Sequence, residues 1–178
     1  MKKFHGFTLI ELMVTLAIVA VLMTMATLSF RYITNSSRIS SEMNALVGSL
    51  QFARAEAIKQ GLPVTVCSST TGTTCSTATT WQDGWIVFVD NNGNANVDTG
   101  DAILRKQASF STLDTFVADN SVGAIIFNRE GFISGLLVDP ATLTLKPVGE
   151  TSSTWTRCLA IGRIGRLTVQ KPGTGNCV

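Results

Sequence analysis

The chain has 178 residues and a formal net charge of +2, which is long enough for one domain with its own core and too short for two comfortable ones. Lys2 and Lys3 account for the excess charge, so a chain without residues 1–6 would be formally neutral and could not coat nucleic acid through a globally basic surface. His5 is the single histidine, which excludes Ser-His and Cys-His nucleophiles and most zinc sites from the rest of the chain. We therefore predict a protein that is not an enzyme and uses no cofactor and no metal centre.

The N-terminal segment has the pattern of a short leader followed by a membrane anchor. Residues 1–6 are cationic and end in Gly6, and residues 7–30 are apolar apart from one charge, Glu11. As a helix, residues 7–30 would span roughly 36 Å, which is sufficient to cross the hydrocarbon core of a bilayer. The preceding lysines predict a cytoplasmic N-terminus and place the rest of the chain outside the cytoplasm. A secretory signal cut after Ala26 and an ordinary single-pass anchor are the alternatives, but neither explains an acid in an apolar helix.

The helical pattern continues beyond the anchor. Apolar residues recur at intervals of three and four on one face, while polar residues fall mostly outside that stripe. Gly61 and Pro63 predict the end of the helix. We expect one helix over about residues 8–60, and its second half, residues 31–60, should pack against a globular head. The stripe consists of Ile39, Met43, Leu46, Leu50, Ala53 and Ala57.

After Pro63 the sequence changes to short β-like runs separated by turn residues. Asn92-Gly93, Thr99-Gly100 and Glu130-Gly131 are turn signals. A helix followed only by strands predicts an α+β fold, with the helix packed on antiparallel β-sheets. Residues 68–80, rich in serine and threonine, are expected to form an exposed loop. The expected strands are residues 63–67, 84–90, 102–107, 112–117, 124–128, 132–138, 157–162 and 166–170.

The four cysteines, Cys67, Cys75, Cys158 and Cys177, form no CxxC pair, which argues against a zinc ribbon or a thioredoxin-type site. In a chain with an export-like N-terminus, an even number of cysteines predicts disulfides. Three pairings are possible, and we expect the local one, Cys67–Cys75 with Cys158–Cys177. Each bridge would contribute about 2–4 kcal/mol by closing a loop.

At the N-terminus, Gly6-Phe7-Thr8-Leu9-Ile10-Glu11 resembles the class III signal of type IV pilins and type II secretion pseudopilins. The resemblance implies that a prepilin peptidase cuts between Gly6 and Phe7 and methylates the new amino group of Phe7. It places Glu11 at the fifth mature position, where the family carries a glutamate. This carboxylate would pair with the cationic amine of a neighbouring subunit during assembly, because a lone charge is costly in low dielectric.

Several runs of the remaining sequence resemble the GspH/FimT family of minor pilins and minor pseudopilins. They are residues 53–58 (ARAEAI), 63–67 (PVTVC), 81–90 (WQDGWIVFVD), 103–105 (ILR), 127–131 (FNREG) and 162–163 (GR). The resemblance implies a type IV pilin-like fold, in which a long N-terminal helix packs on two antiparallel sheets. The implied organisation is a cleaved leader (1–6), a transmembrane or filament-core half-helix (7–30) and a periplasmic head (31–178) with its β domain at 63–178.

The favoured function is that of a FimU/FimT-type minor pilin of a type IV pilus, which primes assembly or forms the filament tip. Its partners would be other minor and major pilin subunits, the inner membrane and the prepilin peptidase. It would lie in the inner membrane with a periplasmic head before assembly, and in the extracellular filament afterwards. The alternatives are a GspH-like minor pseudopilin of a type II secretion system and a pilus-tip receptor for DNA in natural transformation. The two-disulfide head favours the pilus.

Two further clusters have the residue types of a binding site. Residues 90–101 alternate Asp and Asn as a calcium loop does, but Ala95 and Asp101 stand where the template requires glycine and a bidentate glutamate. A plain hairpin loop is therefore predicted. Trp81, Trp85 and Phe88 would suit a ligand-stacking platform, but the alternation in residues 85–89 fits a half-buried strand better, so these aromatic side chains are expected to pack.

The C-terminal segment has no acid after Glu150, and Arg163, Arg166 and Lys171 would lie in one loop closed by the second disulfide. Such a patch could neutralise DNA phosphates. Some FimT-type relatives take up DNA through a GRxR motif, but in Gly162-Arg163-Ile164-Gly165-Arg166 the second arginine is displaced by one residue. On a strand the two arginines would face opposite sides unless Gly165 makes a turn. Solvated charges or subunit contacts are therefore the favoured interpretation.

Overall fold

The computed structural model describes residues 6–76, 78–110, 114–148, 153–175 and 177, without the side chains of residues 25–32, 120 and 153. Most of the predicted leader, residues 1–5, therefore lies outside the described residues. The chain divides into two units, Met1–Arg38 and Ile39–Val178, and each is described by itself.

The first unit contains the N-terminal part of α1, a helix that comprises Leu9–Gln60. Its start is fixed by Thr8, whose side-chain Oγ1 and carbonyl oxygen accept the N–H of Glu11 at 3.3 and 3.1 Å. A threonine that caps the third helical residue satisfies a donor that has no partner inside the helix. The predicted helix, residues 8–60, is confirmed to within one residue.

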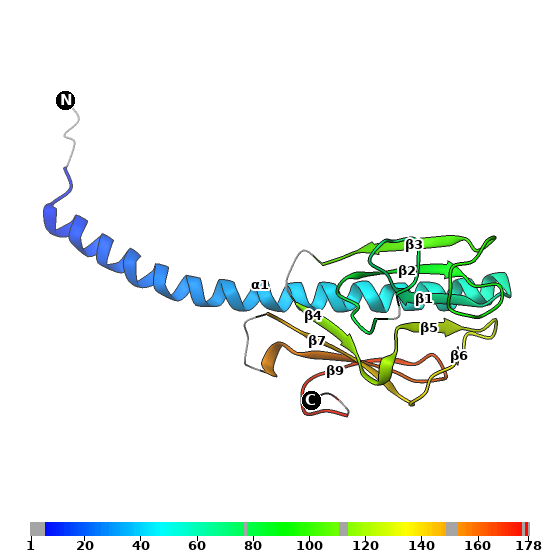
Figure 1. The fold of residues 1–178 in the computed structure, drawn as a ribbon. Helices are drawn as coiled ribbons and strands as arrows, with labels where there is room; N and C mark the ends of the chain where they lie inside the picture. Colours follow the sequence, from blue (N-terminus) through cyan, green and yellow to red (C-terminus); the bar gives the residue numbers. More distant parts are fainter. Residues whose placement is uncertain (1–5, 77, 111–113, 149–152, 176, 178) are drawn as a thin grey trace. The chain divides into compact units, whose positions relative to one another are not determined.

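The second unit is the head, and the C-terminal half of α1 buries one apolar face in its core. All six residues of the predicted stripe are at most 2 % exposed, and they join one core with residues of the strands. Figure 1 shows this part of α1 running beside strands of the head. The helix ends where Gly61 adopts a φ of 67° and donates its N–H to the carbonyl of Ala57 at 3.0 Å, a left-handed cap that glycine adopts without strain.

Two antiparallel sheets complete the head. The five-stranded sheet has the order β3-β2-β1-β5-β6 and the four-stranded sheet has the order β4-β7-β8-β9. The α+β class and the antiparallel pairing predicted from the sequence are confirmed. The strands are β1 (Val64–Ser68), β2 (Gly84–Val89), β3 (Ile103–Ala108), β4 (Thr115–Ala118), β5 (Ala124–Phe127), β6 (Ile133–Ser134), β7 (Ala141–Lys146), β8 (Arg157–Ile161) and β9 (Leu167–Gln170), with 3-10 turns η1 (Asp119–Ser121) and η2 (Ser153–Trp155).

Two strand predictions were wrong. β7, a central strand of the four-stranded sheet, was not predicted at all. The strand predicted at residues 132–138 is real only at Ile133–Ser134, because Gly135 turns the chain with a φ of 75°. Leu137, which follows that turn, is 78 % exposed. Residues 112–113 of another predicted strand lie outside the described residues, and β4 begins at Thr115.

The two disulfides join Cys67 to Cys75 and Cys158 to Cys177, which is the local pairing expected from the sequence. The first closes a loop that covers the outer face of the five-stranded sheet, since Cys67 and Cys75 form a small second core with Ile86 and Phe88. The loop at residues 68–80 is less exposed than predicted. The buried Ser69 donates its hydroxyl to the carbonyl of Thr74 at 2.6 Å.

Removing the second disulfide should weaken the head measurably. In a full-length variant with Cys158→Ala and Cys177→Ala, the free energy of unfolding should fall by about 3 kcal/mol, because a closed loop of this length restricts the unfolded chain. The sequence separation of the pair is 19 residues. Urea unfolding in detergent micelles, followed by tryptophan fluorescence, measures the change. An unchanged unfolding midpoint would contradict a stabilising role for this bridge.

Candidate functional site

The N-terminal motif places an aromatic residue and an acid one helical turn apart. Phe7 is 80 % exposed, and Glu11 lies in the first turn of α1. Among the described residues the Glu11 carboxylate has no partner. An acid in the first turn is favoured by the helix dipole, and Thr8 with Glu11 forms the T-x-x-E signature of a capping box. The sequence itself carries this signature at Thr8 and Glu11.

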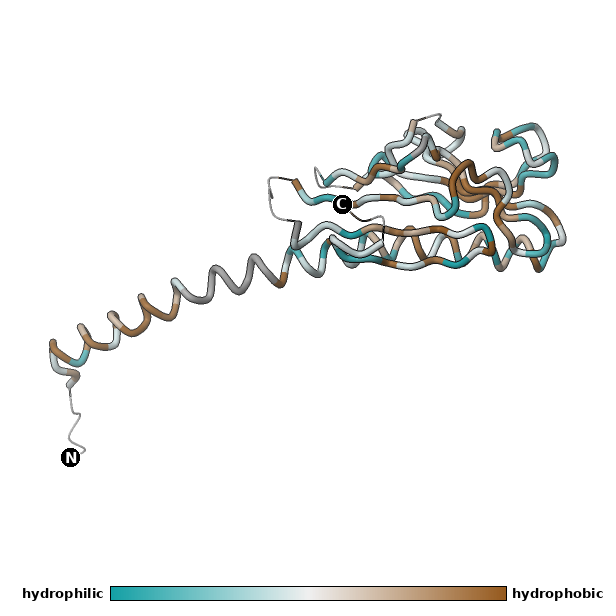
Figure 2. The backbone as a smooth tube through the Cα atoms, turned by 90° about the horizontal axis from the view of Figure 1, so that it is seen from below, coloured by the Kyte–Doolittle hydropathy of each residue, from teal (hydrophilic) through white to brown (hydrophobic). Residues whose placement is uncertain are grey.

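The described side chains of the first unit are unusually apolar and uncovered. Its leucine, isoleucine, valine and methionine side chains up to Met23 are all exposed, and in Figure 2 this part of the chain is largely brown. Over the described part of the chain, we find no helix with both the length and the apolar character needed to cross a membrane.

The basic residues of the C-terminal segment lie around the turn between β8 and β9. Gly162 donates its N–H to the carbonyl of Arg166 at 2.9 Å, and Gly165 donates its N–H to the carbonyl of Gly162 at 2.8 Å. Gly165 has a φ of 76°, a conformation that favours glycine. Arg163 and Arg166 therefore lie in a turn, and the strand alternation that would place them on opposite faces does not apply.

This turn is attached to α1 and to the β5–β6 turn by a close three-way contact. Arg54 of α1 donates Nη1–H to the carbonyl of Gly165 at 3.0 Å. A Cβ at Gly165 would lie 2.8 Å from the carbonyl oxygen of Gly131 and 2.9 Å from Cζ of Arg54, and a Cβ at Gly131 would lie 2.8 Å from Cδ1 of Ile58. At Gly165 a backbone oxygen leaves no room for a side chain, whereas at Gly131 the flexible end of Ile58 could shift and it is the φ of 81° that favours glycine.

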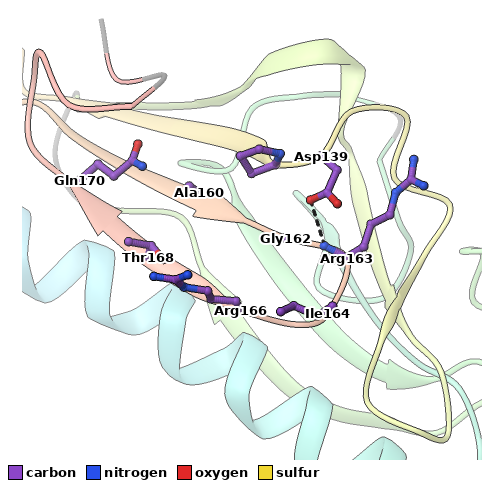
Figure 3. Close-up of a pocket in the computed structure, with 9 residues that line it drawn as sticks. Asp139, Ala160, Gly162, Arg163, Ile164, Arg166, Thr168 and Gln170 are labelled. Atoms are coloured by element: carbon purple, nitrogen blue, oxygen red, sulfur yellow. Dashed lines mark hydrogen bonds between the residues drawn. The ribbon is translucent and has the colours of Figure 1, made fainter.

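Arg163 and Arg166 have different environments. The guanidinium of Arg163 donates Nη2–H to the carbonyl of Leu136 at 3.0 Å, and the backbone N–H of Arg163 donates to Oδ1 of Asp139 at 3.1 Å (Figure 3). The guanidinium of Arg166 has no partner among the described residues, and neither has the ammonium of Lys171. Arg163 and Arg166 line an open pocket of about 410 Å³, of which Lys171 is not a lining residue. The three candidate DNA-binding residues therefore do not form one set of free charges in a single site.

The Asp/Asn loop is held by its own amides. Asp90 is buried and accepts hydrogen bonds from Thr65 Oγ1 at 2.8 Å, Ala95 N at 2.9 Å and Asn94 N at 3.1 Å. The N–H of Asp98, followed by that of Asn91, keeps the pKa of the Asp101 carboxyl below its ordinary value. Within the described ranges, no group of three or more His, Cys, Asp or Glu side chains is placed to hold a metal ion. The geometry is that of a hydrogen-bonded loop between strands.

Calcium should therefore not stabilise this head, whereas Asp90 should. The full-length protein is expected to melt at the same temperature in millimolar Ca²⁺ and in EDTA. Asp90→Ala should lower the free energy of unfolding by about 2 kcal/mol, because it leaves the buried Thr65 hydroxyl and two partly buried N–H groups without their acceptor. Thermal melts followed by circular dichroism check both. A calcium-dependent rise of the melting temperature that Asp90→Ala abolishes would overturn the loop interpretation.

The three aromatic residues pack, as predicted. Trp81, Trp85 and Phe88 are at most 1 % exposed, and Nε1–H of Trp81 donates to the carbonyl of Val122 at 3.0 Å. β2 is buried along its whole length and not on one face only. Trp85 faces the main core and Phe88 faces the second core.

The comparisons with known proteins agree with this geometry. Residues 42–165 match the family model described as type II transport protein GspH, and residues 1–27 match the prokaryotic N-terminal methylation motif. The chain belongs to the GspH family. No curated protein sequence matches this GspH-family chain.

Two solved proteins share the fold. One is the type IV minor pilin FimU of Pseudomonas aeruginosa (strain PAO1), which matches in two crystal forms. The first has 22 % identity, covers 79 % of this chain and 92 % of FimU, and gives a TM-score of 0.58. The second has 23 % identity, covers 75 % and 91 %, and gives a TM-score of 0.54. The minor pseudopilin EpsH from the type 2 secretion system of Vibrio cholerae has 14 % identity over 78 % of this chain and 98 % of EpsH, with a TM-score of 0.50. The predicted pilin-like fold is thereby confirmed.

The matched regions contain the N-terminal motif and the three-way contact, whereas Arg166 and Lys171 lie beyond the GspH match. Gly6, Phe7 and Glu11 lie within the methylation motif. Arg54 and Gly165, which make the three-way contact, lie within the GspH region, which ends at residue 165. As a member of this pilin-type family, the GspH-family chain is implied to be processed by a prepilin peptidase and to assemble with other pilin subunits.

Proposed function

We propose that the protein is a non-enzymatic minor pilin of a bacterial type IV pilus, which primes assembly or forms the filament tip. The observation that carries the proposal is the Glu11 carboxylate, which has no partner among the described residues and lies one turn after Phe7. It stands on the part of α1 in the first unit, where the described leucine, isoleucine, valine and methionine side chains up to Met23 are exposed. A GspH-family head with its own core follows that helix.

The mechanism is assembly. In the inner membrane, lipid covers the apolar side chains of residues 7–30 and the head lies in the periplasm. Cleavage between Gly6 and Phe7 creates a cationic amine at the edge of an apolar helix, and N-methylation retains that charge. The Glu11 carboxylate of one subunit then pairs with the amine of its neighbour, because each charge alone is costly in an apolar environment. In the filament, the helices of other subunits take the place of lipid and cover the apolar side chains of residues 7–30.

The nearest alternative is a GspH-like minor pseudopilin of a type II secretion system, which would use the same fold and the same N-terminal chemistry. The second disulfide, which ties the C-terminal tail to β8, favours the pilus. A DNA receptor for natural transformation is less well supported, since Arg163 is engaged with Leu136 and the free Arg166 lies outside a GRxR motif. DNA affinity depends on several phosphate contacts acting together.

Deletion of the gene in its native host separates these functions. The proposal predicts that surface pili and twitching motility are lost, that secreted enzymes reach the medium at normal levels, and that DNA uptake falls only as far as pilus loss requires. Expression of the full-length chain should restore pili. Normal piliation with failed secretion would contradict the pilus assignment and support the pseudopilin. Normal piliation with failed DNA uptake would support the receptor.

A further inference from the structure

The peptide bond between Gly6 and Phe7 lies outside the helix. Residues 6–8 are exposed and not helical, and α1 begins at Leu9. Figure 1 shows this short stretch leading into α1. Across the described residues, the carbonyl of Gly6 accepts no backbone hydrogen bond. In a helix that began at Phe7, the same carbonyl would accept the N–H of Ile10. The bond that processing must break is therefore in an open conformation.

Thr8 determines where the helix begins. Its Oγ1 accepts the N–H of Glu11 at 3.3 Å, and its carbonyl oxygen accepts the N–H of Glu11 at 3.1 Å and that of Leu12 at 3.2 Å. These are the bonds of an N-cap residue, whose own backbone is not helical. In a longer helix the N–H of Glu11 would bond to the carbonyl of Phe7 instead. The Thr8 hydroxyl therefore competes with an extension of the helix toward the leader.

The sequence around Thr8 offers no other strong stop. No proline precedes Thr8 in the chain, so no residue before it lacks the N–H of a helical bond. Gly6 is a poor helix former but is accepted at the cap position of a longer helix. In the membrane that the proposed function requires, an apolar environment favours every additional backbone bond. The cap at Thr8 is thus the feature that keeps the start of α1 at Leu9.

We propose that Thr8 is a positioning residue for leader cleavage, because its cap leaves the Gly6 carbonyl free for the peptidase. Hydrolysis consumes one water molecule. The bond from the Gly6 carbonyl carbon to the Phe7 nitrogen breaks, Gly6 keeps a carboxylate, and Phe7 leaves with the amine. In a longer helix this carbonyl would be bonded to the next turn, which would block the approach of water. The inference rests on the proposed function, since it concerns its processing step.

Pulse-chase labelling of the full-length protein in its native host measures the rate of cleavage. Thr8→Val keeps the shape of the side chain and removes the acceptor, and it should slow cleavage about fivefold, the shift expected for loss of an N-cap. Thr8→Ser and Thr8→Asn retain a capping oxygen and should be cleaved at nearly the wild-type rate. Thr15→Val is the matched control, because Oγ1 of Thr15 donates within the helix to the carbonyl of Leu12 at 2.9 Å. It should leave the rate unchanged.

Amide hydrogen exchange reports the start of the helix independently of the peptidase. The uncleaved full-length protein is purified in detergent micelles from a strain that lacks the peptidase. In Thr8→Val the N–H of Ile10 should exchange several-fold more slowly than in the wild type, because the carbonyl of Gly6 becomes its partner. Thr8→Asn should exchange as the wild type does.

Equal cleavage rates for the wild type and Thr8→Val would overturn the inference. Slow cleavage of Thr8→Asn would also overturn it, because the peptidase would then recognise the threonine side chain itself. Slow cleavage of Thr8→Val with unchanged exchange at Ile10 would do the same. In each of these outcomes the wild-type chain still begins at Phe7, and the proposed function stands. A wild-type chain that is not cut after Gly6 contradicts the inference and the proposed function together.

Discussion

Replacing Glu11 by glutamine is expected to remove the protein from assembled filaments while leaving cleavage after Gly6 intact. The bonds from Glu11 to Thr8 are made by its backbone N–H, so glutamine keeps them and removes only the charge. The amine of the neighbouring Phe7 would then be left unpaired in an apolar environment. Breaking a buried pair from one side costs about 3–5 kcal/mol, which corresponds to a loss of incorporation of at least about a hundredfold. Immunoblots of sheared filaments and of membranes measure the distribution.

A matched control lies on the same helix. Glu56 is a second glutamate of α1, and in the head it pairs with Lys59 at 3.1 Å and accepts a hydrogen bond from Gln60 at 2.7 Å. Glu56→Gln should leave incorporation unchanged. Normal incorporation of the Glu11→Gln variant would refute the pairing role. Failure to cleave the leader would instead assign Glu11 to processing.

Gly165→Ala should lower the stability of the head by more than its backbone conformation alone would cost. The new Cβ would lie 2.8 Å from the carbonyl oxygen of Gly131 and 2.9 Å from Cζ of Arg54, at a φ of 76°. The left-handed conformation costs an alanine about 1–2 kcal/mol, and a weakened hydrogen bond from the charged Arg54 adds about 1.5–3 kcal/mol. We expect the free energy of unfolding of the full-length protein to fall by about 4 kcal/mol in urea titrations.

Gly173 provides the control for this substitution, since it has the same φ of 76° but nothing within 4 Å of its would-be Cβ. Gly173→Ala should therefore cost only the conformational part, about 1–2 kcal/mol. The difference between the two variants isolates the three-way contact. Equal losses would show that the contact of Gly165 with Gly131 and Arg54 contributes nothing.

The helix was predictable because its periodicity is carried by residues of one kind over many turns. The apolar stripe from Ile39 to Ala57 fits the period of a helix and not that of a strand. Gly61 and Pro63 indicate where the helix ends. The strands at Val64–Ser68 and Gly84–Val89 are apolar and bounded by turn residues. Local chemistry and tertiary packing agree in these segments.

β7 was not predicted because its sequence, ATLTLK, contains small and polar residues that do not indicate a buried strand. Thr142 is nevertheless 2 % exposed, in a strand that lies between β4 and β8 in the sheet. The run at residues 132–138 gave the opposite error, for its apolar side chains resemble a strand while Gly135 turns the backbone after Ser134. In β7 the tertiary packing overrides the local pattern, whereas at residues 132–138 a single glycine ends the strand.

The contacts of the basic residues could not be predicted from the sequence either. Both Arg163 and Arg166 are arginines three positions apart, yet among the described residues it is the guanidinium of Arg163 that meets a carbonyl, that of Leu136. Arg54 lies 111 positions from Gly165, and no local pattern indicates their contact. The prediction that Gly165 would decide the geometry was possible because glycine alone adopts such a turn without strain.

Mass spectrometry of the N-terminus of the protein isolated from its native host tests the central claim most directly. The account predicts a mature chain that begins at Phe7 and carries one methyl group on its amine, in membranes and in filaments alike. A chain that retains Met1, or one cut after Ala26, would contradict it.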